Sequence, residues 1–188
     1  MRLIVGISGG SGVIYGIRLL QVLKKLNVES HLIITTAGRE TIRLETSFKL
    51  SEVEALATEN YRIGDIASKL SSGSFRTDGM VIIPASMKTV GGIASGYADN
   101  LLLRAAEVTL KERRPLVLVP RETPLNLIHL ENMVKVTQAG AVVLPAMPAF
   151  YQKPKSVDDL VDHIVGKVLD ILGVEHDLYR RWTGVRSE

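Results

Sequence analysis

Five short apolar runs alternate along the chain with segments that have the period of an amphipathic helix. The first run, Leu3–Ile7, is followed by Val13–Leu26, in which Ile14, Ile17 and Leu20 recur at helical spacing. Strands that are apolar throughout and separated by helices pair in parallel and are covered on both faces. The expected strands are Leu3–Ile7, His31–Thr35, Met80–Ile83, Pro115–Val119 and Ala141–Leu144.

The helical segments complete the predicted architecture, an α/β fold with a doubly wound parallel sheet. Ser51-Glu52-Val53-Glu54 has the pattern of a capping box, which predicts a helix through Ala57. The whole should be a three-layer sandwich of the Rossmann or flavodoxin type, one domain over residues 1–188 with a tail at 173–188. The other expected helices are Val13–Leu26, Ala37–Glu45, Asp65–Leu70, Asn100–Glu112, Leu125–Thr137 and one from Ser156 to about Leu172.

Composition argues against several classes of function. The chain has no cysteine, so disulfides, zinc–thiolate sites and cysteine nucleophiles are excluded. A net charge of +3 is small, and the basic run Lys111–Arg114 has no aromatic neighbours, so we expect no nucleic-acid partner. We expect no signal peptide and no membrane span, hence a cytoplasmic protein. A hydrophobic fraction of 46% leaves surplus apolar surface, which predicts a homo-oligomer.

The loop after the first strand has the composition of an anion site. In Gly6–Gly12 (GISGGSG), the backbone of Gly9 and Gly10 can approach a ligand, Ser11 adds a hydroxyl, and the next helix offers its N-terminal N–H groups. The loop lacks the lysine of a Walker A motif and the glycine spacing of a dinucleotide fingerprint. A tight strand-to-helix turn is the alternative interpretation.

The loops after the second and third strands also carry hydroxyls. The second strand ends in Thr35 rather than in the acid that binds an adenosine ribose, which favours FMN over NAD. The third is followed by Ser86-Met87-Lys88-Thr89, which offers hydroxyls, an ammonium and amides to a phosphate or a flavin edge. Simple helix N-caps at Thr35 and Ser86 are equally compatible with these residues.

The loop after the fourth strand begins with Arg121 and Glu122. A guanidinium at the carboxyl edge of the sheet can clamp a phosphate with two hydrogen bonds, and a carboxylic acid beside it can donate a proton to a leaving phosphate. An Arg–Glu surface pair is the alternative.

Two patterns that could suggest a metal are better explained without one. Asp158, Asp159 and Asp162 resemble an Asp-rich box, but the box occurs once and follows Ser156 in the first turn of a helix, where acids suit the dipole. The histidines have no ligand spacing. We therefore expect no metal. The histidines are His31, His129, His163 and His176.

Over essentially its whole length the chain resembles the UbiX-like flavin prenyltransferase family. The central block Leu110–Met133 is the most specific part of the resemblance, and the glycine-rich loop is the least specific. The other matching segments are LET at Leu44–Thr46, SSGSF at Ser71–Phe75, PASMKT at Pro84–Thr89, NLLLRAAEV at Asn100–Val108, PAFY at Pro148–Tyr151 and RRW at Arg180–Trp182.

The resemblance implies prenyl transfer to FMN. Dimethylallyl phosphate donates its five-carbon group to N5 and C6 of reduced FMN, and the prenylated FMN serves a UbiD-like decarboxylase. The resemblance also implies a dodecamer. Because the chain has no paired Asp-rich boxes but has several candidate cations and a phenol, we expect the phosphate to leave without a metal. The expected FMN-binding residues are Gly9, Gly10, Ser11, Thr35, Ser86, Met87, Lys88, Thr89 and Arg121. The expected dimethylallyl phosphate residues are Arg104, Lys111, Arg121, Tyr151, Lys167 and Trp182. The expected catalytic residues are Glu45, Lys111, Glu122 and Ser11.

Three positions depart from what is frequent in the family. Thr35 replaces a serine but keeps the hydroxyl, Lys167 replaces an arginine and loses the bidentate fork, and Ala85 replaces a cysteine. Three other functions are weighed against prenyl transfer: an FMN-dependent cysteine decarboxylase of related fold, a non-catalytic flavin carrier, and a direct aromatic-acid decarboxylase.

Overall fold

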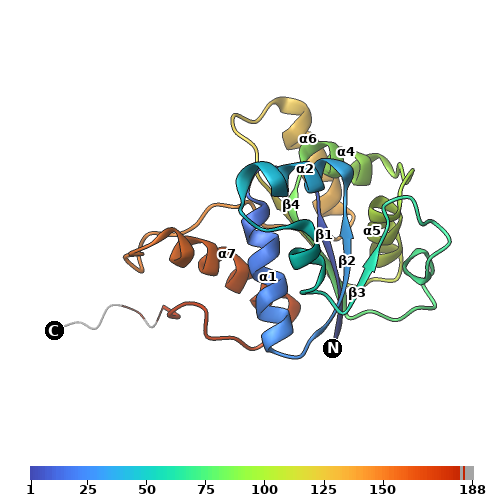
Figure 1. Cartoon of the computed structure of the whole chain (residues 1–188). Helices are drawn as coiled ribbons and strands as arrows, with labels where there is room; N and C mark the ends of the chain where they lie inside the picture. Colours follow the sequence, from blue (N-terminus) through green and yellow to red (C-terminus); the bar gives the residue numbers. More distant parts are fainter. Residues whose placement is uncertain (183, 185–188) are drawn as a thin grey trace.

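A six-stranded, all-parallel sheet organises the part of the chain that the computed structural model describes, residues 1–182 and 184 (Figure 1). Its strand order is β3-β2-β1-β4-β5-β6, so the chain reverses its direction of travel across the sheet between β1 and β4. This confirms the doubly wound fold. The strands are β1 (Arg2–Ile7), β2 (Glu29–Ile34), β3 (Glu59–Tyr61), β4 (Gly79–Ala85), β5 (Leu116–Pro120) and β6 (Val142–Val143).

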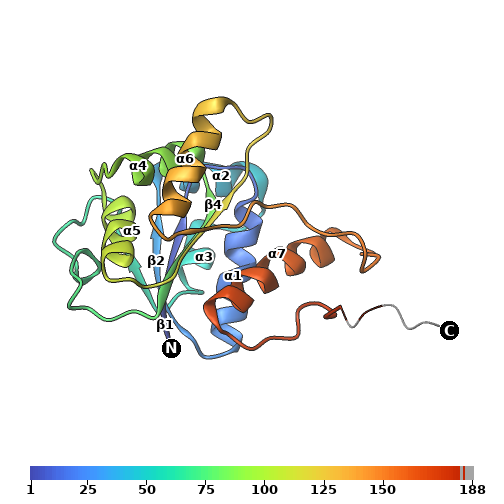
Figure 2. The ribbon, with the colours of Figure 1, turned by 180° about the vertical axis from the view of Figure 1, so that it is seen from behind.

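Helices cover both faces of this sheet. Figures 1 and 2 show α1 and α7 on one side and α5 on the other. None of the described helices combines the length and apolarity that crossing a bilayer requires. The helices are α1 (Val13–Lys25), α2 (Thr36–Glu45), α3 (Leu50–Glu54), α4 (Met87–Ser95), α5 (Leu101–Lys111), α6 (Leu127–Gln138) and α7 (Val157–Leu172), with a 3-10 turn, η1, at Lys69–Ser71.

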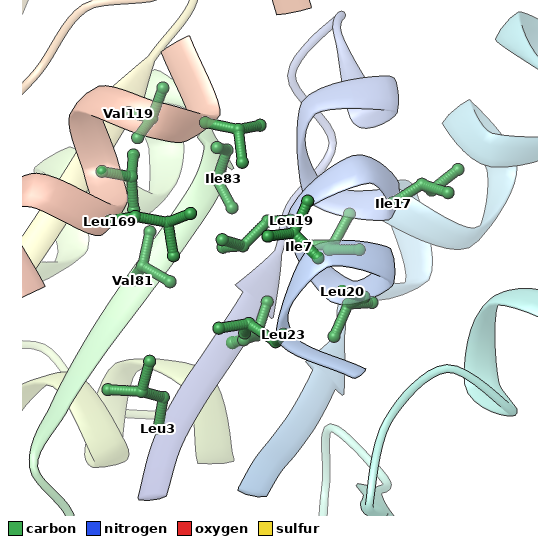
Figure 3. Packing of buried hydrophobic residues seen from close by; sticks show 14 of the residues in the cluster. Leu3, Ile7, Ile17, Leu19, Leu20, Leu23, Val81, Ile83, Val119 and Leu169 are labelled. Carbon is green, nitrogen blue, oxygen red and sulfur yellow. The ribbon is translucent and has the colours of Figure 1, made fainter. Parts of the chain in front are cut away.

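The core lies in two layers because alternate strand residues point to opposite faces of the sheet. Leu3 and Ile7 of β1 pack under α1 and α7, as Figure 3 shows with Leu23 and Leu169. Ile4 of the same strand faces α5 instead. The apolar runs of the strands thus hold both helical layers in place.

Two helix predictions were wrong. The helix expected after Ser51 begins instead after Lys49, whose N–H donates to the Glu52 carboxylate at 2.7 Å, and it ends at Glu54. The segment expected as a helix at residues 65–70 consists of turns followed by η1.

Two elements were not predicted. β3 is a three-residue edge strand in which two residues are exposed, so it has no apolar run. α4 contains Gly91 and Gly92, which have low helix propensity and mask its pattern in the sequence. At the other edge, β6 has two residues rather than the four expected.

Candidate active site

A cavity of about 470 Å³ opens at the carboxyl ends of β1, β2 and β4, where the sheet reverses its order. Five residues predicted to bind FMN line it: Gly9, Thr35, Ser86, Lys88 and Thr89. Sequence reasoning missed the rest of the wall, which comes from the first turn of α2, the segment after β3, α4 and the segment after it, and the start of α5. These further residues include Ile63, Gly91, Gly92, Ser95, Tyr97, Asp99, Asn100, Leu102 and Leu103.

Two helix N-termini meet at this cavity. Thr35 caps α2, its hydroxyl accepting the N–H of Gly38 at 3.0 Å. Ser86 caps α4, its hydroxyl accepting the N–H of Thr89 at 3.3 Å. The N-cap interpretation of both residues is therefore confirmed. Because the first turn of each helix also lines the cavity, two positive dipole ends and the exposed Lys88 face the same space, which suits a phosphate.

Ser8 ties the loops on either side of the cavity together. Its hydroxyl donates to the carbonyl of Pro84 at 2.8 Å and accepts the N–H of Ser86 at 2.7 Å. Gly9 in turn lies close to the first turn of α2, since a Cβ at this position would be 2.5 Å from the Cβ of Ala37. The floor of the cavity is thus closely packed.

Glu45 occupies the N-terminus of α1. Its carboxylate accepts the N–H of Gly12 at 2.8 Å and that of Val13 at 3.3 Å. The glycine-rich loop was expected to offer these helix N–H groups to a phosphate, and the structure gives them to a side chain instead. Glu45 is thereby held beside the loop that carries Gly9.

Arg121 and Glu122 lie in a second hollow, of about 300 Å³, after β5. Both are exposed, and the hollow is otherwise largely apolar, with Met133 and Met147 in its wall. Burial raises the pKa of Tyr15 on α1, and the nearby positive charge of Arg121 acts in the opposite direction. The Arg121 charge is therefore near enough to Tyr15 to be felt at its hydroxyl.

Tyr151 and Trp182 form part of a third hollow, of about 290 Å³, near the end of the described chain. Their rings meet edge to face with centroids 5.6 Å apart. Lys167 of α7 is exposed, with its ammonium 4.0 Å from the carboxylate of Asp170. Three of the predicted substrate residues thus gather around α7 rather than at the FMN cavity.

Arg104 and Lys111 are engaged elsewhere within one chain. Arg104 donates to the carbonyl of Ser71 at 3.3 Å and pairs with Glu107 at 2.8 Å. Lys111 is the last residue of α5 and pairs with Glu112. Since α5 ends just before β5 begins, Lys111 lies at the amino edge of the sheet, opposite the cavity.

The remaining predicted FMN residues differ in their placement. Gly10 is buried, and a Cβ there would be 3.4 Å from Pro84. Ser11 is exposed at the turn into α1. Met87 packs in the core beneath α4 instead of lining the cavity. The prediction that Met87 lines the FMN site therefore has no support in the shape of the cavity.

No group of three potential metal-ligating side chains is gathered among the residues that the structure describes. The aspartates of the apparent Asp-rich box have structural partners. Backbone hydrogen bonds from Lys155 and Ser156 lower the pKa of Asp159, and Asp162 forms a two-pronged bridge to Arg18 at 2.6 and 3.0 Å. The structure confirms that Asp158 and Asp159 lie in the first turn of α7, which follows Ser156.

Comparison with known proteins assigns the family. The family model described as Flavoprotein matches residues 1–169. Flavin prenyltransferase UbiX of Escherichia coli K12 is 54% identical over 186 residues, 97% of this chain and 98% of that protein. The chain belongs to the UbiX-like flavin prenyltransferases. The resemblance seen in the sequence is thereby confirmed.

Solved structures of the UbiX-like family superpose closely on this chain. A structure described as AnUbiX (PadA1) in complex with FMN and dimethylallyl pyrophosphate has a TM-score of 0.97 at 49% identity, with 98% of each chain covered. A dodecameric FMN-dependent UbiX-like decarboxylase from Escherichia coli O157:H7 has a TM-score of 0.96 at 53% identity, covering 98% of this chain and all of that one. Peptidyl-cysteine decarboxylase EpiD shares only the fold, with 15% identity and a TM-score of 0.66.

Proposed function

We propose that this chain is a flavin prenyltransferase that transfers the dimethylallyl group of dimethylallyl phosphate to N5 and C6 of reduced FMN. The observation that carries the proposal is the cavity at the point where the sheet reverses, where Thr35, Ser86 and Lys88 meet two helix N-termini. Membership of the UbiX-like family supports the same activity.

The cavity residues would bind the FMN. Lys88, the hydroxyls of Thr35, Ser86 and Thr89, and the first-turn N–H groups of α2 and α4 would hold its phosphate. Gly9 leaves room for the rest of the nucleotide beside β1, with Gly10 and Ser11 in the same loop. Reduced FMN supplies the electron-rich N5 and C6 atoms to which the five-carbon group becomes bonded.

The cationic residues would promote departure of the donor's phosphate. When the allylic C–O bond breaks, the phosphate leaves with the electron pair, and Arg121, Lys167 and the phenol of Tyr151 would stabilise its charge without a metal. Glu122 would donate a proton to the phosphate. N5 would lose its proton as it bonds to the first carbon, and the double bond of the five-carbon group would gain a proton as its other end bonds to C6, which loses one. Glu45 or the released phosphate would carry these protons, so that one proton in all leaves with the phosphate. Trp182 would face the allyl group.

Neighbouring copies of the chain would supply the remaining residues predicted to bind dimethylallyl phosphate. Arg104 and Lys111 lie away from the cavity within one chain, and a relative is dodecameric. α6 also presents exposed apolar side chains, among them Leu127, Ile128 and Val134. A dodecamer in which one copy lends its cations to another accounts for both observations.

The proposal has three further parts, the last of which follows the family resemblance. Residues 1–188 form one flavoprotein domain with a tail at 173–188, the protein acts in the cytoplasm, and a UbiD-like decarboxylase receives the prenylated FMN. A non-catalytic flavin carrier would bind FMN in the same cavity, so the deciding experiment has to follow the chemistry.

The test incubates the protein anaerobically with reduced FMN and dimethylallyl phosphate in EDTA, then measures the mass of the extracted flavin. We expect a flavin enlarged by one five-carbon unit. A parallel sample with the diphosphate identifies the preferred donor. An unchanged flavin mass with and without EDTA would contradict prenyl transfer, whereas a product formed only without EDTA would contradict the metal-free mechanism.

A further inference from the structure

Residues 174–182, which we call the C-terminal arm, fold back along α7. Figures 1 and 2 both show the arm running beneath this helix, back toward the end where the helix begins. One carboxylate, that of Asp170, accepts hydrogen bonds from three arm residues. His176 Nε2 lies at 3.1 Å, Arg181 at 2.7 Å, and the hydroxyl of Tyr179 also donates to it. Asp170 is therefore the main polar anchor of the arm.

A glycine in the middle of α7 makes room for the arm. A Cβ on Gly166 would lie 2.5 Å from the Tyr179 ring and 2.8 Å from the His176 ring. Glycine is a poor helix former, so its place in the buried part of α7 has a packing reason. The Gly166 slot is a second contact, independent of charge, that fixes where the arm lies.

Aromatic rings continue from this anchor to the predicted substrate residues. The ring centroids are 5.4 Å apart for His176 and Tyr179, 5.2 Å for Tyr179 and His163, and 6.4 Å for His163 and Tyr151. Tyr151 in turn contacts Trp182, the chain's one tryptophan. A shift of the arm at Asp170 would thus be passed on to Tyr151 and Trp182.

The charges at the anchor also favour an anion nearby. Lys167 lies 4.0 Å from Asp170, so this carboxylate lies between the ammonium and the guanidinium of Arg181. Burial by itself would raise the pKa of Asp170, but hydrogen bonds from Arg181, Tyr179 and His176 lower it to about 2. With one negative charge against two positive ones, the cluster keeps net positive charge for a phosphate.

We propose that Asp170 is a positioning residue for the prenyl donor. It holds the C-terminal arm on α7, so that Tyr151, Lys167 and Trp182 form one wall of the pocket that receives dimethylallyl phosphate. The inference deepens the proposed function and rests on it. Asp170 itself lines neither the FMN cavity nor the hollow of Tyr151 and Trp182, so it acts through the arm.

The test compares Asp170→Asn with Asp162→Asn. The control removes a carboxylate from the same helix, breaks the bridge to Arg18 and leaves the arm alone. In Asp170→Asn we expect the KM for dimethylallyl phosphate to rise about tenfold, because a charge-assisted anchor of the binding wall is lost, with kcat within about twofold. The affinity for FMN should stay unchanged. Asp162→Asn should leave the KM at its wild-type value.

Trp182 gives a readout that does not depend on turnover. Its fluorescence anisotropy should fall in Asp170→Asn and stay unchanged in Asp162→Asn, because the only tryptophan lies on the arm. An unchanged anisotropy, or a lower anisotropy with an unchanged KM, would overturn the inference. A wild-type chain that makes no prenylated flavin would instead overturn the proposed function, and the anisotropy would still decide whether Asp170 holds the arm.

A second variant covers the case in which Asp170→Asn does not fold. Gly166→Ala keeps every charge and introduces a better helix former, but its methyl group displaces Tyr179 and His176. We expect α7 to be retained by circular dichroism, while the KM for dimethylallyl phosphate rises and the Trp182 anisotropy falls. Wild-type values of both would contradict a positioning role for the arm.

Discussion

The FMN cavity and the region around the C-terminal arm are built in different ways. The cavity is made by loops that follow β1, β2 and β4, which are hydrogen-bonded neighbours in one sheet. The arm region has no strand to align it and depends on side-chain contacts to α7. The FMN cavity is therefore lined by residues of one chain, whereas the proposed donor site would draw on the arm and on other copies.

The largest expected effect separates the chemistry from FMN binding. Replacing Glu122 with Gln removes the proposed proton donor, so prenyl transfer should slow by about 100-fold, as general-acid loss does. The dissociation constant of FMN should stay at the wild-type value, since Glu122 lies in a separate hollow. Glu131→Gln on α6 is the control. An unchanged transfer rate would remove Glu122 from the mechanism.

A mixing experiment tests whether Lys111 and Glu122 reach one donor site from different copies of the chain. Lys111→Ala and Glu122→Gln should each be almost inactive alone. If random reassembly brings the two groups from different chains, about a quarter of the sites regain both. The control mixes Arg121→Ala with Glu122→Gln, which lie side by side in one chain and should give no recovery. Equal activity in the two mixtures would contradict the shared site.

A substitution in the FMN cavity should weaken FMN binding, which Glu122→Gln is expected to leave unchanged. In Gly9→Ala the new Cβ would be 2.5 Å from that of Ala37 and would push apart the loops after β1 and β2. The affinity for FMN should fall about tenfold, a typical cost of overpacking, with the arm unaffected. Titration of FMN fluorescence measures this loss. Gly64→Ala, which has open space around it, is the matched control and should bind FMN normally.

Acid should weaken the arm region through Asp170. Its pKa falls from an ordinary value of 3.8 to about 2 on folding, so its stabilising effect is present above pH 4 and fades as the pH falls toward 2. At pH 3 the wild type should have lost about 1 kcal/mol of this contribution relative to pH 6. Thermal unfolding midpoints measured at pH 6 and pH 3 test this loss of stability. An equal drop of the midpoint in Asp170→Asn would show that the loss does not come from the Asp170 carboxylate.

The sequence predicted the centre of the sheet better than its edges. β1, β2, β4 and β5 are buried on both faces, so each leaves an apolar run in the sequence. The edge strands β3 and β6 have exposed residues and leave little or no such run. The loops beyond the central strands, and with them Thr35 and Ser86, were therefore placed correctly.

The rest of the site depends on contacts between distant segments. The hydrogen bonds of Glu45 to Gly12 and Val13 join residues more than thirty positions apart, and no local pattern announces them. The same holds for Trp182, which contacts Tyr151 across 31 positions. The cavity wall from α4 was missed because Gly91 and Gly92 weaken the helical signal.

Ser8 has a consequence for how a ligand enters the cavity. The Ser8 hydroxyl bonds both the carbonyl of Pro84 and the N–H of Ser86, so the loop after β1 is held against the loop after β4 without a bound nucleotide. Little ordering entropy then remains to be lost upon association, so affinity can come from few contacts. A receptor shaped in advance in this way needs little rearrangement to accept its ligand.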